Sequence, residues 1–194
     1  MEKVKRLVVG ISGASGAVLA IRLLKELQSL KDWETHLVIS SGAKRTIKEE
    51  VPESIDEVKE LATFVHDLED VGASIASGTF KTEGMVVIPC SMKTLAGIAN
   101  GYSDNLLLRA ADVTMKERRS LVLVARETPL SRIHLQNMAM LASFGVTLMP
   151  PMMTFYNHPL TIEDMQTHIV GKVLNEFGVE TRNFHRWVGS DSRQ

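Results

Sequence analysis

The chain contains 194 residues, of which 44% are hydrophobic and 23% are charged, and its formal net charge is −1 at pH 7. These values are typical of one globular domain and exclude a disordered, collagenous or coiled-coil chain. Because 22 basic residues are balanced by 23 acidic ones, no global positive field is available to hold nucleic acid or an anionic membrane. We therefore expect neither as a partner, and any anionic ligand must be bound by local groups.

The cysteine content and the N-terminal segment bear on cellular location. The single cysteine, Cys90, excludes an internal disulfide framework and is expected to be an inert buried thiol. The N-terminal apolar run is short and is followed by a glycine-rich turn, which is unlike a signal peptide. No window approaches the roughly 20 apolar residues of a membrane span. These features predict a soluble, cytoplasmic protein.

Apolar runs and helical repeats alternate along the chain. Continuous runs rich in β-branched residues predict strands at 6–11, 35–40, 84–90, 120–125 and 146–149. Helical spacing and capping residues, Asp104 among them, predict helices at 17–29, 44–50, 54–63, 91–100, 104–118, 131–144 and 161–177. Residues 66–83 are predicted to form a long loop. The chain from about residue 188 is expected to be flexible or to pack on a neighbouring subunit.

Strands that alternate with helices indicate βαβ units. We therefore predict a single α/β domain over residues 1–194, with a parallel sheet and helices on both faces. In such sheets, ligands bind beyond the carboxyl ends of the strands, where the strand order reverses. The segments expected at that edge are 12–16, 40–41, 89–94, 126–129 and 149–156.

The first predicted strand runs into a glycine-rich turn at residues 10–16. Its spacing is G-x-x-G-x-x-G, which differs from the G-x-G-x-x-G of dinucleotide enzymes. Glycines let the backbone approach a phosphate, and the helix that follows offers unpaired N–H groups. The second strand ends in Ser40 and Ser41, without an acidic residue for a ribose diol, so the pattern favours a mononucleotide over NAD. A purely structural turn is the alternative, and Ser91 and Thr94 can likewise either cap a helix or bind a ligand.

Cationic side chains accompany the predicted nucleotide site. Arg109 and Lys116 are seven residues apart and share one face of a predicted helix. Arg126 and Glu127 place a cation and a carboxylate at a strand end, where a surface ion pair is the alternative interpretation. Two or more cations near a mononucleotide suggest a second, phosphate-bearing ligand. The six histidines show no metal-ligand spacing, so no metal is expected.

Seven motifs follow one another along nearly the whole chain. They are GASG at 13–16, PCSMKT at 89–94, DNLLLRAAD at 104–112, KERR at 116–119, RETP at 126–129, IHLQNM at 133–138 and PPMMTFY at 150–156. Each motif alone is weak, whereas the ordered set is specific. The set resembles that of the UbiX-type flavin prenyltransferases, including the paralogues that accompany phenolic acid decarboxylases.

The resemblance implies a Rossmann-like, flavodoxin-type flavoprotein that joins dimethylallyl monophosphate to reduced FMN. The implied reaction bonds the prenyl group to flavin N5 and then to C6, without a metal. It further implies that the prenylated FMN passes to a UbiD-type decarboxylase, and that the chain forms a homo-oligomer, in this family usually a dodecamer built from trimers. Whether the donor is a monophosphate or a diphosphate stays open.

The resemblance also implies roles for individual residues. The implied FMN-binding residues are Gly13, Ala14, Ser15, Ser40, Ser91, Met92, Lys93, Thr94 and Arg126. The implied dimethylallyl phosphate residues are Arg109, Lys116, Arg126, Tyr156 and Lys172. The implied catalytic residues, which would stabilise the leaving phosphate or relay protons, are Ser15, Glu50, Lys116 and Glu127. The motifs do not decide whether Glu50 or its neighbour Glu49 faces the site.

Two other functions remain open on the sequence. A direct FMN-dependent decarboxylase of the peptidyl-cysteine type would carry an early histidine and an asparagine after the third strand. Residues 10–29 contain no histidine and residues 89–94 contain no asparagine. A flavin carrier or accessory subunit of a decarboxylase would not need Arg109, Lys116 and Glu127 together with the other cations. The complete set therefore favours catalysis.

Overall fold

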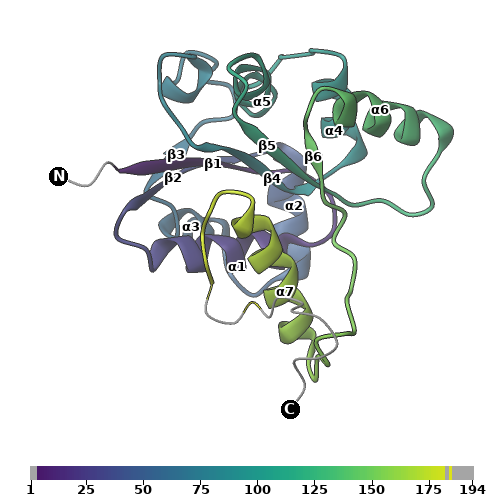
Figure 1. The fold of residues 1–194 in the computed structure, drawn as a ribbon. Coiled ribbons are helices and arrows are strands. Elements are labelled where there is room, and N and C mark those ends of the chain that lie inside the picture. The colour runs from purple at the N-terminus through teal and green to yellow at the C-terminus, as the bar shows by residue number, and fades with distance from the viewer. Residues whose placement is uncertain (1–3, 182–183, 185–194) are drawn as a thin grey trace.

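The computed structural model describes residues 4–181 and 184, and Figure 1 shows their arrangement. Strands of one parallel sheet lie in the order β3-β2-β1-β4-β5-β6. Their bounds are β1 (Lys5–Ile11), β2 (Trp33–Ile39), β3 (Phe64–His66), β4 (Gly84–Cys90), β5 (Ser120–Ala125) and β6 (Thr147–Leu148). The expectation for the tail from about residue 188 lies outside the described residues.

Helices cover both faces of this sheet (Figure 1). One layer contains α1 (Ala17–Gln28), α2 (Ser41–Glu50), α3 (Ile55–Glu60) and α7 (Ile162–Asn175). The other layer contains α4 (Met92–Ala99), α5 (Leu106–Lys116) and α6 (Arg132–Ser143), together with the short 3-10 helix η1 (Ser74–Ala76), which packs on α5. The predicted α/β fold is thereby confirmed.

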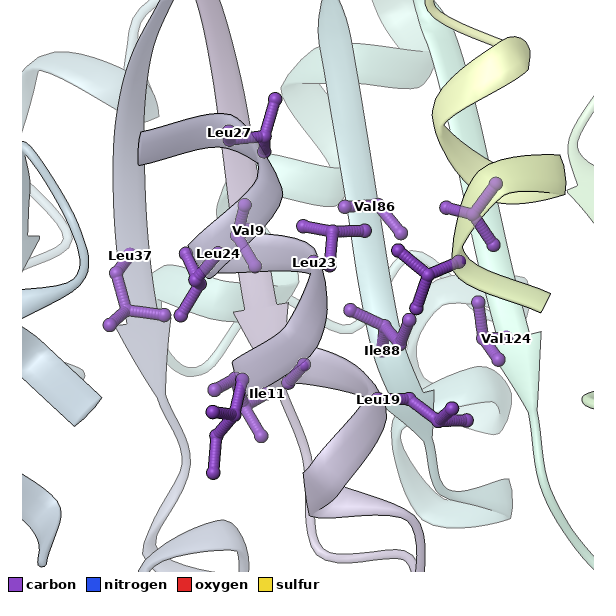
Figure 2. Packing of buried hydrophobic residues seen from close by; sticks show 14 of the residues in the cluster. Val9, Ile11, Leu19, Leu23, Leu24, Leu27, Leu37, Val86, Ile88 and Val124 are labelled. Carbon is purple, nitrogen blue, oxygen red and sulfur yellow. The ribbon is translucent and has the colours of Figure 1, made fainter. Parts of the chain in front are cut away.

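Two apolar cores lie between the sheet and its helix layers. Side chains alternate along each strand, so Val9 and Val86 face α1 whereas Val8 and Val87 face the opposite layer. Figure 2 shows the first core, in which leucines of α1 such as Leu23 pack on the central strands. The continuous apolar runs of the sequence are therefore strands buried on both faces.

The strand order reverses between β1 and β4. The chain first moves outward from β1 to β2 and β3, and then crosses to β4 and continues in the other direction. With β3 included, this is the classic Rossmann order, and without this short edge strand it is the flavodoxin order. The crevice between the carboxyl ends of β1 and β4 is therefore the place where such folds bind ligands.

Several predicted boundaries need correction. The sequence pattern does not predict β3, because a strand of three residues at the edge of the sheet is too short to show an alternation of apolar and polar residues. The predicted strand at 146–149 is ordered as a strand only at Thr147–Leu148. The cap of α5 is Asn105, whose side chain accepts the Leu108 N–H at 3.1 Å, and not Asp104.

The predicted loop at 66–83 is held in place by contacts to α5 and to Arg119, which lies between α5 and β5. Ile75 of η1 is buried in the second core. The Arg119 guanidinium donates hydrogen bonds to the carbonyls of Gly78 and Phe80. Within the part of the chain that the structure describes, no helix is long and apolar enough to cross a bilayer.

Candidate functional site

A pocket of about 260 Å³ opens at the reversal of strand order. It lies where β1, β2 and β4 run into the segments that follow them, as the fold predicts. Its lining residues are Gly13, Ser40, Ser41, Gly42, Leu68, Ser91, Lys93, Thr94, Asn105, Leu107 and Leu108. The structure thus brings five of the residues assigned to FMN, namely Gly13, Ser40, Ser91, Lys93 and Thr94, into one pocket.

Two helices begin at this pocket. Ser40 caps α2 by accepting the Ala43 N–H at 3.1 Å, and Ser91 caps α4 by accepting the Thr94 N–H at 3.3 Å. The first amides of a helix have no intrahelical acceptor, and the helix dipole adds a partial positive charge there. Two converging N-termini, with Lys93 beside them, make this pocket suited to an anion such as a phosphate.

The N-terminus of α1 is occupied differently from the other two. The Glu50 carboxylate accepts the N–H groups of Gly16 at 2.8 Å and Ala17 at 3.0 Å. Although burial raises the pKa of Glu50, the hydrogen bond from Ser15, these two amides and the charge of Arg126 together lower it. The Gly16 and Ala17 amides, which the glycine turn is expected to leave unpaired for a phosphate, are thus bound by a carboxylate of the chain itself. Glu50, and not Glu49, faces the turn.

The glycine turn also has a packing role. A Cβ atom on Gly13 would lie 2.9 Å from the Cα of Gly42, so a side chain there would separate the turn from α2. Ser12, which is 1% exposed, donates a hydrogen bond to the Pro89 carbonyl at 2.9 Å and accepts the Ser91 N–H at 2.7 Å. These contacts fix the first turn against the start of α4. The turn therefore packs against α2 and α4, and through Gly13 it also lines the pocket.

Four of the residues assigned to FMN do not line the pocket, namely Ala14, Ser15, Met92 and Arg126. Met92, the first residue of α4, is 8% exposed and packs into the second core. Ala14 is 9% exposed and belongs to the turn. The Cys90 thiol is buried, and burial raises its pKa to about 12, which agrees with the inert role predicted for it.

Arg126 lies beside the pocket at the end of β5. Its N–H donates a hydrogen bond to the Cys90 carbonyl at 3.0 Å, which ties this turn to the end of β4. Its positive charge acts on Glu50. Glu127 is exposed, and its carboxylate accepts the Thr128 N–H at 3.0 Å. Arg126 therefore belongs electrostatically with Glu50 and Ser15, and Glu127 stands apart at the rim.

Arg109 and Lys116 lie on α5, which leads away from the pocket. Arg109 pairs with Asp112 at 2.6 Å, and Lys116 pairs with Glu117 beside Gly78. Because α5 begins at the pocket and rises about 1.5 Å per residue, its last turn lies roughly 15 Å further on, near the amino end of β5. The structure does not bring Lys116 to the pocket of its own chain.

Tyr156 and Lys172 both belong to the layer that contains α7. The Tyr156 hydroxyl lies 3.2 Å from Nε2 of His168 on α7. Lys172 follows His168 by four residues, so both lie on the same side of that helix. The first half of α7 lies near Glu50, because Glu163 and Gln166 line a groove with it.

Several pocket residues were not assigned from the sequence. Asn105 shares its capping chemistry with the neighbouring Asp104. Leu68, Leu107 and Leu108 carry no local signal, because only the packing of α5 and the 66–83 loop brings them to the pocket. Within the described ranges, no cluster of three or more His, Cys, Asp or Glu residues could hold a metal ion.

Comparison with known proteins identifies the family. Residues 1–174 match the family described as Flavoprotein. The chain is 54% identical over 185 residues to a probable UbiX-like flavin prenyltransferase of Sedimentibacter hydroxybenzoicus, covering 95% of this chain and 98% of that protein. The chain belongs to the UbiX-like flavin prenyltransferases. The resemblance read from the seven motifs is confirmed.

Solved UbiX-like structures share the whole fold. The dodecameric FMN-dependent UbiX-like decarboxylase of Escherichia coli O157:H7 is 54% identical, with a TM-score of 0.93 over 95% of this chain and all of that one. AnUbiX (PadA1), in complex with FMN and dimethylallyl pyrophosphate, is 48% identical, with a TM-score of 0.94 over 96% of this chain and 99% of that one. The overall fold is thus common to all three chains.

Proposed function

We propose that this protein is a flavin prenyltransferase that transfers the dimethylallyl group of dimethylallyl phosphate to reduced FMN. The observation that carries the proposal is the pocket at the strand-order reversal, where the capped N-termini of α2 and α4 converge. Arg126 is tied to the residue before the α4 cap by its hydrogen bond to the Cys90 carbonyl. A 48% identical relative binds FMN and a dimethylallyl phosphate ester, which supports the same pair of ligands here.

The pocket fits FMN. The close approach of Gly13 and Gly42 leaves backbone at the surface, and Ser40, Ser91 and Thr94 offer hydroxyls around two helix N-termini. These groups would hold the phosphate of FMN, with Lys93 near it, while Ala14 and Ser15 lie on the side of the turn toward Arg126. Reduced FMN would supply the nucleophilic N5 and C6 positions.

Ser15, Glu50 and Arg126 form one electrostatic unit in this proposal. The lowered pKa keeps Glu50 a carboxylate at neutral pH, so it holds the Ser15 hydroxyl and balances Arg126 rather than donating a proton. Glu127, exposed at the rim, is free to move a proton between the site and solvent. Arg126 provides positive charge where the phosphate of the prenyl donor carries its negative charge.

Lys116 would act in the site of a neighbouring copy. It lies at the end of α5 away from its own pocket, whereas Arg109 directly follows the pocket-lining Leu108, and a phosphate leaving group needs such cations nearby. Large apolar side chains are exposed on α6 and in the 149–162 segment, among them Ile133, Phe144 and Met152. Exposed apolar surface of this kind is typical of subunit interfaces, and one relative is dodecameric.

The biological setting completes the proposal. The prenylated FMN would be passed to a UbiD-type decarboxylase, which uses it as cofactor. A cytoplasmic location suits a reduced flavin acceptor and a chain with a single cysteine.

The decisive test is the mass of the flavin after anaerobic incubation of the protein with reduced FMN and dimethylallyl monophosphate. A gain equal to one C5H8 unit supports the proposal, and a parallel incubation with the diphosphate selects between the two donors. Recovery of unchanged FMN with both donors would reject prenyl transfer and leave a flavin carrier. Release of CO₂ from an added peptide or aromatic acid by the FMN-loaded protein alone would instead support a direct decarboxylase.

A further inference from the structure

Two neighbouring residues at the end of β1, Ile11 and Ser12, hold the starts of both helices that meet at the pocket. The Ile11 carbonyl accepts the N–H of Ser40, the N-cap of α2, at 3.0 Å. The Ser12 hydroxyl accepts the N–H of Ser91, the N-cap of α4, at 2.7 Å. The end of this one strand therefore fixes the two helix N-termini relative to each other.

The two connections differ in kind. Pairing between β1 and β2 extends to Ile39, so the link to α2 simply continues the backbone ladder. Pairing between β1 and β4 ends at Val87, before α4 is reached. The Ser12 side chain bridges the rest of the way, because its hydroxyl donates to the Pro89 carbonyl at 2.9 Å while its oxygen accepts the Ser91 N–H. Ser12 is 1% exposed, so removing its hydroxyl leaves that N–H without an acceptor.

Each of the two helices begins with backbone amides that its own cap does not use. The cap of α2 accepts the Ala43 N–H, and the cap of α4 accepts the Thr94 N–H. No residue that the structure describes accepts the amides that come before these, which are those of Ser41, Gly42, Met92 and Lys93. Ser41, Gly42 and Lys93 line the pocket. Pairs of successive unpaired amides at a helix start are suited to a phosphate.

We propose that Ser12 is a positioning residue, which sets the start of α4 against the start of α2 so that amides of both helices bind the same phosphate group, that of FMN. Hydrogen bonds weaken steeply when their distance and angle depart from the ideal. A shift of α4 relative to α2 therefore weakens the grip on the phosphate without touching the rest of the flavin. The proposal rests on the proposed function, which places FMN in this pocket.

The test compares oxidised FMN with riboflavin, which lacks the phosphate, by measuring the Kd of each on wild-type and variant protein. Ser12→Ala is expected to weaken FMN about ten-fold and riboflavin less than about two-fold. Inorganic phosphate, measured as a competitor of FMN, should also lose affinity in Ser12→Ala. Thr35→Val is the matched control and should leave all three ligands unchanged. It removes another buried hydroxyl that accepts a backbone N–H, that of Thr63 at 2.9 Å, and Thr35 does not line the pocket.

Three outcomes would overturn the proposal. These are an equal loss of FMN and riboflavin affinity in Ser12→Ala, an unchanged FMN affinity in a folded Ser12→Ala protein, and equal affinity of the wild-type protein for the two flavins. Binding of FMN without prenyl transfer would reject the proposed function and leave the role of Ser12 standing, so the two failures are distinguishable.

A second variant and a wild-type measurement cover the case in which Ser12→Ala does not fold. Ser12→Cys keeps a side chain of similar shape whose sulfur is only a weak acceptor, so it should show the same selective loss at a smaller size. A crystal structure of the FMN-loaded wild-type protein should place the phosphate within hydrogen-bond distance of amides from both helix starts. A phosphate that contacts only one of them would contradict the proposal.

Discussion

The Glu50 side chain determines what the backbone amides of the glycine-rich turn bind in this structure. Its carboxylate binds the two amides at the start of α1, which the glycine spacing alone would assign to a phosphate. The same carboxylate faces Ser15 and Arg126. A negative charge at a helix N-terminus stabilises the helix, and here it also balances a cation at the edge of the pocket.

Glu50→Gln is expected to lower the free energy of unfolding by about 1 kcal/mol or less at pH 7, since the carboxylate is solvent-exposed. Because the folded state lowers the pKa of Glu50, its contribution is present above its ordinary value near 4.5 and is lost as the pH falls through the lower folded value. Urea unfolding at pH 7 and at pH 3 measures both effects. Glu49→Gln is the matched control, and an equal loss in that variant would contradict the assignment.

Glu127→Gln tests proton relay at the rim. The Glu127 carboxylate is exposed and accepts the N–H of the neighbouring Thr128, so substitution by the amide is expected to cost less than about 1 kcal/mol of stability. If Glu127 relays protons, turnover should fall roughly 10²-fold or more while FMN binding is retained. Flavin fluorescence measures binding and product mass measures turnover. Near-normal turnover of an FMN-loaded variant would remove Glu127 from the mechanism.

The edge of the sheet formed by β2 and β3 contains a buried histidine pair. Nδ1 of His36 lies 3.0 Å from Nε2 of His66, and the His36 ring stacks on Phe64 and meets the edge of Phe80. Burial, followed by the neighbouring His66, lowers the pKa of His36 to about 4. The element therefore holds a neutral imidazole under the 66–83 loop.

Acidification should weaken this element. Between pH 6.5 and about 4, His36 is protonated in the unfolded chain and neutral in the folded chain. The free energy of unfolding therefore falls as the pH is lowered through this range. His36→Phe keeps the ring stacking and should flatten that pH dependence, with Arg6, Glu34 and Asp70 as the remaining charges nearby. The exposed His158→Asn is the control. An unchanged pH slope in His36→Phe would show that His36 is not the group responsible.

Ser91 has two roles, because it caps α4 and its side chain also lines the pocket. Ser91→Ala removes the cap of α4 and a hydroxyl that lines the pocket, so we expect a stability loss of about 1 kcal/mol together with weaker FMN binding. Ser54→Ala removes the comparable cap of α3, which does not line the pocket, and should cost similar stability without affecting FMN. Thermal unfolding and flavin titration separate the effects. Unchanged FMN affinity in Ser91→Ala would place the phosphate elsewhere.

At the scale of the whole molecule, the residues predicted to bind the prenyl donor lie far apart within one chain. Lys116 and the pocket lie at opposite ends of α5, whereas Arg126 lies at the pocket rim. A site shared between two copies would reunite them, which makes activity a property of the assembly rather than of one chain.

Mixed assemblies test this arrangement. Lys116→Ala and Arg126→Ala should each be inactive as homo-oligomers. Co-refolded in equal amounts, they should regain about a quarter of wild-type activity, since one site in four then combines an intact Lys116 from one chain with an intact Arg126 from another. Product mass per flavin provides the measurement, and each variant refolded alone is the control. No recovery in the mixture would mean that each chain builds its own site.

Local signals in the sequence determined most of the secondary structure. Most of the strands and the helix caps Ser54, Ser91 and Ser131 follow from patterns only a few residues long. The ordered motifs determined the family, because together they cover nearly the whole chain.

Only the tertiary structure decided which groups meet. Glu50 reaches the start of α1 from 33 residues away, and Leu68 reaches the pocket because its carbonyl accepts the Leu106 N–H. No local pattern encodes the strand order, so the edge strand β3 is formed only by pairing with β2. The pocket forms at the start of α5, and Lys116 at the end of that helix is therefore far from it. Periodicity and capping act between near neighbours, whereas a binding site is made by strand pairing and side-chain packing between segments far apart in the sequence.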